Sequence, residues 1–301
     1  MSTNPSLLSV FPAMVDWLYA GLIRASGELS TSDPDARLGG KLLYAGELDR
    51  AGCPLLVASN IAGAASLSAT VDVARQKQAI RDGVIDFLVT SLDEALRILK
   101  NEIRKRNTVA VCVALGPEQV EREMLELGVL PDLLPPGALY AHRFEAFIER
   151  GARLVDPVAV QGNQAVLRWS VDLEPALWLP KLDALAGDSL PPEAWSARRW
   201  LRLAPRYLGR QAQGMRLLRC DAKAAASFLL RVRQQVAWGE IRVPVEIWSN
   251  RQGESRPHRF LPPADSDDGT HPGIRRMHRS HAGYLSNAAR VTEVRGITLR
   301  P

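Results

Sequence analysis

Short apolar runs alternate with amphipathic segments along residues 41–127, and this alternation restricts the fold more than any other feature. The run 108–114 is nearly all apolar and β-branched, which is typical of a buried strand. Asp72 and the box Ser91-Leu-Asp-Glu94 predict helix starts, whereas Gly83 and Gly128 predict helix ends. Strand, crossover helix and strand at this spacing predict a doubly wound parallel α/β sheet with helices on both faces.

We therefore expect residues 1–150 to form a Rossmann-like domain, with a helix over 10–25 packed at the sheet edge. Residues 151–301 predict a second, smaller α/β unit. There we expect a hairpin of strands 154–160 and 165–171 around Gly162-Asn163, and a long polar arm at about 250–283. The remaining elements expected in this half are helices over 174–185, 192–213 and 222–239 and strands over 215–220, 243–249 and 291–299.

Composition and length exclude several protein classes. A chain of 301 residues that is 46% hydrophobic and 24% charged is neither disordered nor a disulfide scaffold. No apolar run reaches the roughly 18 residues that a membrane helix needs, and residues 1–12 lack the pattern of a secretory signal. Cys53, Cys112 and Cys220 lie far apart, which favours reduced thiols. We expect a cytoplasmic protein without a membrane partner, and a homo-oligomer is compatible with these features.

Charge is distributed unevenly between the two halves. Residues 1–150 carry 15 Lys+Arg against 19 Asp+Glu, whereas residues 151–301 carry 23 against 14. The basic half permits binding of nucleic acid or another polyanion, and the alternative is an ordinary solvated surface. Six tryptophans in this half are interleaved with arginines and either stack on bases or form a core stripe. These tryptophans are Trp169, Trp178, Trp195, Trp200, Trp238 and Trp248, and the interleaved arginines are Arg198, Arg199, Arg202, Arg206 and Arg210.

Three histidines, His271, His278 and His281, lie within eleven residues near the C-terminus. Histidine clusters hold metals or phosphates, but this spacing is not that of a zinc helix and no carboxylate pair accompanies it. We therefore expect no metal site and interpret the cluster as part of a basic arm.

Five segments in one order carry a family resemblance. They are Gly40-Lys-Leu-Leu-Tyr-Ala-Gly46, Pro54-Leu-Leu-Val-Ala-Ser-Asn-Ile-Ala-Gly63, Ser66–Asp72 with Arg75, Leu92-Asp-Glu-Ala-Leu96 and Gly128-Val-Leu-Pro-Asp132. With these segments, residues 38–132 resemble the central Rossmann-like domain of urocanase, an enzyme that uses tightly held NAD to hydrate urocanate in histidine breakdown. The resemblance implies the same fold, with an NAD site after the first strand. Urocanases are roughly twice as long, and their flanking substrate regions are not recognisable here.

The cofactor turn departs from the urocanase pattern. The urocanase turn is rich in glycine, whereas Gly46-Glu-Leu-Asp-Arg-Ala-Gly52 keeps glycine only at its ends. Its carboxylates would repel a diphosphate, and an arginine within the turn offsets part of that charge. Thr70 replaces the acid that holds a ribose in the family, and Asp72 could substitute for it. The cofactor-binding residues expected from the resemblance are Gly46, Asp49, Arg50, Gly52, Ser59, Asn60, Thr70 and Asp72.

These observations leave three functional hypotheses. The first is a divergent, shortened urocanase-like protein without urocanate hydratase activity, which binds a nucleotide or metabolite or acts as an accessory protein. The second is an NAD-dependent lyase of the hydratase type related to urocanase, with its site at the carboxyl ends of the first two strands. The candidate residues there are Glu47, Asp49, Arg50, Ser59, Asn60, Thr70 and Asp72. The third is binding of nucleic acid or another polyanion through the basic C-terminal half.

Overall fold

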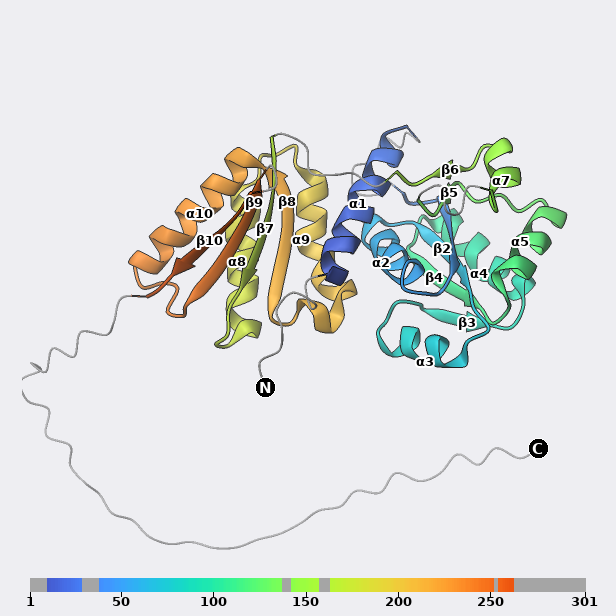
Figure 1. Cartoon of the computed structure of the whole chain (residues 1–301), viewed down its shortest axis with the longest axis horizontal. Coiled ribbons are helices and arrows are strands. Elements are labelled where there is room, and N and C mark those ends of the chain that lie inside the picture. The colour runs from blue at the N-terminus through green and yellow to red at the C-terminus, as the bar shows by residue number, and fades with distance from the viewer. Residues whose placement is uncertain (1–9, 29–37, 137–141, 157–162, 252–253, 263–301) are drawn as a thin grey trace, which may run out of the picture. The chain divides into compact units, whose positions relative to one another are not determined.

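The computed structural model describes residues 10–28, 38–136, 142–156, 163–251 and 254–262. The first half of the chain forms a six-stranded sheet in the order β3-β4-β2-β1-β5-β6, in which every adjacent pair is parallel. This confirms the predicted Rossmann-like α/β fold. This half of the chain is coloured blue to green in Figure 1. Its strands are β1 (Leu42–Glu47), β2 (Ala65–Ala69), β3 (Phe87–Val89), β4 (Val109–Val113), β5 (Leu133–Leu134) and β6 (Arg153–Leu154).

The predicted local signals start and end the helices of this half. The carboxylate of Asp72 accepts hydrogen bonds from the backbone N–H groups of Ala74 and Arg75, and so caps the next helix. The Ser91 hydroxyl accepts the N–H of Glu94 in the same way. These helices are α1 (Val10–Glu28), α2 (Gly52–Ala62), α3 (Val73–Arg81), α4 (Leu92–Lys105), α5 (Pro117–Glu126) and α7 (Glu145–Glu149).

Helices cover both faces of this sheet, which explains why β2 and β4 are buried at every position. Helix α2 belongs to the core on one face, whereas α4, α5 and α7 belong to the core on the other. The chain therefore leaves β1 towards one face, and the helix that follows β5 lies on the opposite face. Since β1 and β5 are neighbours, their carboxyl ends form the point where a sheet of this kind usually binds ligands.

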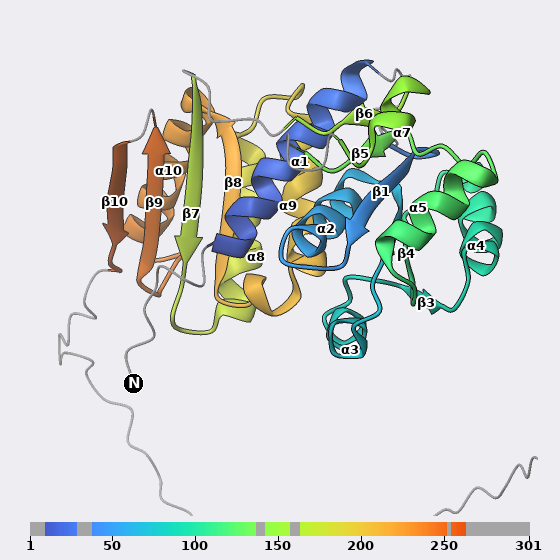
Figure 2. The ribbon, with the colours of Figure 1, turned by 45° about the vertical axis from the view of Figure 1, so that its right-hand side comes forward.

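The second half forms a four-stranded antiparallel sheet in the order β10-β9-β7-β8. Helices lie behind this sheet, as Figure 2 shows. The Trp169 ring of β7 lies 5.0 Å from the Phe228 ring of the last helix, so this face of the sheet is core. The elements are β7 (Gln164–Ser170), β8 (Met215–Asp221), β9 (Val245–Arg251), β10 (Glu254–Phe260), α8 (Pro175–Ser189), α9 (Trp195–Tyr207), the 3₁₀ turn η2 (Gly209–Ala212) and α10 (Ala222–Ala237).

Three sequence expectations are corrected. The predicted hairpin does not form, because β6 pairs with β5 in the first sheet while β7 pairs with β8 and β9 in the second. The start of the predicted polar arm is a strand, because β10 is a full antiparallel partner of β9. Helix α1 does not lie at the edge of the parallel sheet but packs on α2 and β8. The rest of the arm, the strand expected over 291–299 and the histidine cluster lie outside the described residues.

One apolar core runs from the parallel sheet into the antiparallel sheet. It includes side chains of β1, α1 and α2 together with side chains of α9, β7 and β9. Polar contacts cross the same region. The Tyr19 hydroxyl of α1 donates to the carbonyl of Ser196, and Arg199 Nε of α9 donates to the carbonyl of Ile61 in the last turn of α2. Among the described helices, none combines the length and apolarity that a bilayer span requires.

Candidate ligand site at the end of strand β1

The turn between β1 and α2 has a backbone that demands glycine at both ends. Gly46 has a φ of +74°, a value that side chains with a Cβ rarely adopt. A Cβ on Gly52 would lie 2.0 Å from the carbonyl oxygen of Glu47, so only glycine fits there. The two glycines expected from the sequence therefore shape the turn.

Asp49 fills the anion position at the start of α2. Its Oδ1 accepts hydrogen bonds from the N–H groups of Ala51 and Gly52, each at 2.8 Å. The N–H groups of a helix start are the donors that hold a cofactor diphosphate in Rossmann-like folds. In this turn two such donors are used by the protein's own carboxylate. Arg50 is exposed beside them.

Glu47, Thr70 and Arg75 form a hydrogen-bonded group at the ends of β1 and β2. The Thr70 hydroxyl donates to Glu47 Oε1 at 2.6 Å, and Arg75 donates to the same oxygen at 3.2 Å. Arg75 also lies 3.2 Å from Asp72 Oδ2, whose other oxygen caps α3. Thr70 is buried, and its hydroxyl donates to Glu47. The hydroxyl therefore does not face an open ribose site.

Sequence reasoning placed Glu47 among the candidates of the lyase hypothesis but did not assign Arg75 to the site. Glu47 and Thr70 lie at the ends of neighbouring parallel strands. Their positions therefore predict that the two side chains lie at the same edge of the sheet.

Ser59 and Asn60 do not join the other expected site residues. Both are buried in the last turns of α2, about 10 Å along the helix from Gly52 at its start. Asn60 Nδ2 donates to the carbonyl of Val84, which follows α3. The structure brings together Gly46, Asp49, Gly52, Thr70 and Asp72 at the carboxyl edge of the sheet, with Arg50 exposed at the turn, and places Ser59 and Asn60 elsewhere.

The family comparison agrees with this geometry. Residues 26–143 match the urocanase Rossmann-like domain. The match confirms the resemblance seen in the sequence and extends it on both sides. It includes β1 to β5 and the turn described above, and it ends before the antiparallel sheet, so the urocanase likeness is a property of the first half only.

The residues of the urocanase-like turn do not fit NAD, the cofactor that this domain binds in urocanase. A diphosphate at the start of α2 would have to displace Asp49, and Glu47 would add a second negative charge within the turn. Arg75, the cation of the group at the ends of β1 and β2, is already paired with Glu47 and Asp72. The turn keeps glycine at both ends but supplies its own anion.

The three thiols are not activated nucleophiles. Burial raises the pKa of Cys53 and of Cys112 to about 11, and that of Cys220 to about 12. A nucleophilic cysteine needs a lowered thiol pKa. Within the described ranges no three His, Cys, Asp or Glu side chains are grouped so that they could hold a metal ion.

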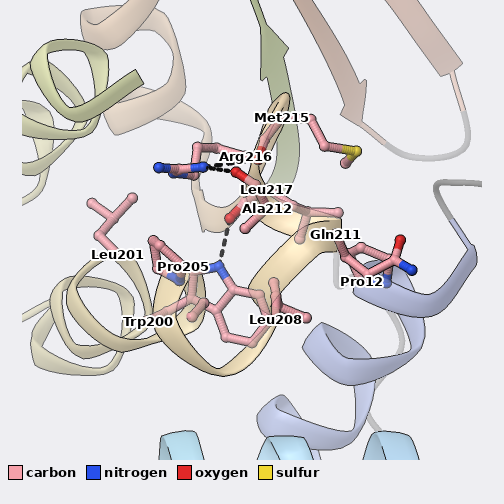
Figure 3. Close-up of a pocket in the computed structure, with 11 residues that line it drawn as sticks. Pro12, Trp200, Leu201, Pro205, Leu208, Gln211, Ala212, Met215, Arg216 and Leu217 are labelled. Carbon is pink, nitrogen blue, oxygen red and sulfur yellow. Dashed lines mark hydrogen bonds between the residues drawn. The ribbon is translucent and has the colours of Figure 1, made fainter. Parts of the chain in front are cut away.

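Two hollows lie away from the carboxyl edge. One, drawn in Figure 3, has about 10 Å³ of free space between α9, η2 and β8, and Trp200 and Leu217 line it. It has room for about one water molecule and not for a metabolite. The other is a shallow surface hollow of about 810 Å³ beside the edge strand β3, with Phe87 and Arg97 in its lining.

The tryptophans of the second half divide between core and surface. Trp169, Trp178 and Trp200 are buried, which confirms the core interpretation for these three. The interleaved arginines of α9 are exposed except for Arg199. Trp238 and Trp248 remain exposed, at 67% and 36%.

Proposed function

We propose that this chain is a divergent urocanase-like protein that does not hydrate urocanate and acts as a binding or accessory protein. The observation that carries the proposal is the position of Asp49, whose carboxylate accepts the two N–H groups at the start of α2. Because the Asp49 carboxylate occupies the anion site at the start of α2, the Rossmann-like domain serves as a rigid scaffold and holds no NAD.

The test is a thermal-shift and calorimetric titration of the purified chain with NAD. We expect no shift, whereas a bound ligand at one hundred times its Kd would stabilise the protein by about 2.7 kcal/mol. Urocanate added with NAD should keep its ultraviolet absorbance over hours. NAD that co-purifies with the protein, or turnover of urocanate, would contradict the proposal.

The Asp49→Gly variant sharpens this test. It frees the N–H groups of Ala51 and Gly52, so weak NAD binding is expected to appear in this variant and not in the wild-type chain. Asp49→Asn is the matched control, because the amide oxygen still accepts both bonds and keeps the position filled. If both variants bind NAD as poorly as the wild type, then Asp49 does not decide cofactor binding.

The second candidate is an NAD-dependent lyase related to urocanase, and the retained glycines favour it. Gly46 and Gly52 hold the close backbone turn that a dinucleotide site requires. This candidate would need Asp49 to turn away when NAD binds. The same titration separates the two, because only this candidate predicts a thermal shift for the wild-type chain.

A further inference from the structure

The outward face of strands β7, β9 and β10 belongs to the second half of the chain, outside the residues that match urocanase. Side chains alternate along β7, so that Leu167 and Trp169 point into the core. Arg168 points to the opposite face and lies beside Trp248 of β9. The face therefore consists of exposed or half-buried side chains on a rigid antiparallel sheet. Figure 2 shows its strands side by side, with α8 and α10 behind them.

Trp248 lies at the middle of this face. It is directly opposite Arg168 on one neighbouring strand and Pro257 on the other. The Arg168 guanidinium carbon lies 5.5 Å from the centre of the Trp248 ring, and the ring stays 36% exposed. Burying an indole is favourable, so an exposed one on a rigid sheet is available to a ligand with a flat face.

One arginine of the outer strand lies on the same face as the ring. Arg259 on β10 pairs with Glu246 at 3.5 Å, but their side chains are 68% and 48% exposed, so the pair is weak and open to exchange. The strand register places Arg168, Arg259 and one carboxylate, Glu246, on the same face as Trp248. The segment 163–262 as a whole carries 16 Lys+Arg against 9 Asp+Glu. An anionic ligand therefore matches the charge of this region.

We propose that this face binds single-stranded nucleic acid, with a base stacked on Trp248 and phosphates contacted by Arg168 and Arg259. An indole accepts any base by stacking, and arginines beside it hold the backbone charge. A single strand fits better than a duplex, because the bases of a duplex are stacked on one another and do not expose a face to a flat sheet. The site is separate from the β1–α2 turn, so it does not depend on the proposal about NAD.

The experiment is a fluorescence-anisotropy titration of the full chain with labelled oligonucleotides of about 12 nucleotides. Oligo-U and oligo-dT are compared with a duplex of the same length. We expect both single strands to bind more tightly than the duplex, and their ratio to report whether the 2′-hydroxyl contributes. The wild-type tryptophan fluorescence should fall as a base stacks.

Trp248→Ala is expected to weaken single-strand binding by about fivefold to a hundredfold. Trp238→Ala is the matched control, because Trp238 is more exposed but lies at the end of α10 and not on the sheet face. Trp248→Phe should restore most of the binding, which separates stacking from a loss of folding. Arg259→Gln should lower the dependence of log K on log salt by about 0.7.

Three results would overturn the proposal. They are a failure of single strands to bind at low salt, equal losses for Trp248→Ala and Trp238→Ala, and a duplex bound as tightly as a single strand. The last result would indicate general attraction of polyanions by the basic half. General attraction of polyanions would also be indicated if Trp248→Ala changed neither the binding of single strands nor the binding of heparin.

Discussion

Asp16 and Arg219 form an ion pair between α1 and β8, and it is the most buried of the ion pairs described here. Arg219 donates to Asp16 Oδ2 from Nη2 at 2.8 Å and from Nε at 3.1 Å, and the two side chains are 5% and 13% exposed. Burial raises the pKa of Asp16, although the guanidinium opposes this. Breaking one side of such a pair costs far more than breaking an exposed pair, because a charge stays behind in the core.

Asp16→Asn is therefore expected to lower the free energy of unfolding by about 3 kcal/mol. Urea denaturation followed by circular dichroism measures this loss. Asp156→Asn is the control, because Asp156 pairs with Arg24 on the surface at 78% and 48% exposure and should cost less than about 1 kcal/mol. Similar losses for the two variants would show that burial does not set the strength of the first pair.

At this scale the sequence indicated the right residue types but not their contacts. Asp49 was recognised as a carboxylate in a cofactor turn, yet its role as the acceptor for Ala51 and Gly52 depends on the backbone of the turn. Trp169 lies between Arg168 and Ser170, whereas Trp248 follows Ile247, and the strand register places Trp169 in the core and Trp248 on the surface.

At the scale of elements, α3 shows how a predicted cap acts. Asp72 lies at its start and accepts the N–H groups of Ala74 and Arg75 at 2.8 and 3.2 Å. Asp72→Ala is expected to lower the free energy of unfolding by about 1 kcal/mol, because these donors lose their acceptor. Thermal melts of the two proteins measure the difference.

Asp82 is the matched control for this helix, because it lies at the opposite end as the residue after the last turn. A carboxylate there opposes the helix dipole, so Asp82→Ala should be neutral or slightly stabilising. Equal destabilisation by the two substitutions would contradict the capping role of Asp72. If Asp72 also bound a ligand, as the sequence allowed, its substitution would change NAD titrations as well.

At the scale of the whole molecule, the described residues up to 262 share one continuous core. Side chains of β1 and α2 in the parallel sheet and of β7 and β9 in the antiparallel sheet belong to the same cluster, with α1 and α9 between them. We therefore expect a single calorimetric unfolding transition for the full chain. Two resolved transitions would show that residues 1–150 and 151–301 unfold as independent domains.

The sequence alone determined the elements of the first half, because their signals are local. Apolar strands, caps such as Asp72 and helix-ending glycines act within a few residues, so β1 to β4 and α2 to α5 follow from their own segments. The urocanase likeness lies in the same region for the same reason.

Only the tertiary structure decided the partners of the remaining elements. The short strand β6 pairs with β5, α1 packs between the two sheets, and β10 completes the edge of the second sheet. These pairings depend on contacts between segments far apart in the chain. Local sequence patterns do not predict the free energy of such contacts. The exposed ring of Trp248 arises from the same long-range geometry, whereas the carboxylate of Asp49 accepts hydrogen bonds from residues two and three positions further along the chain. Each functional proposal rests on one of these two features.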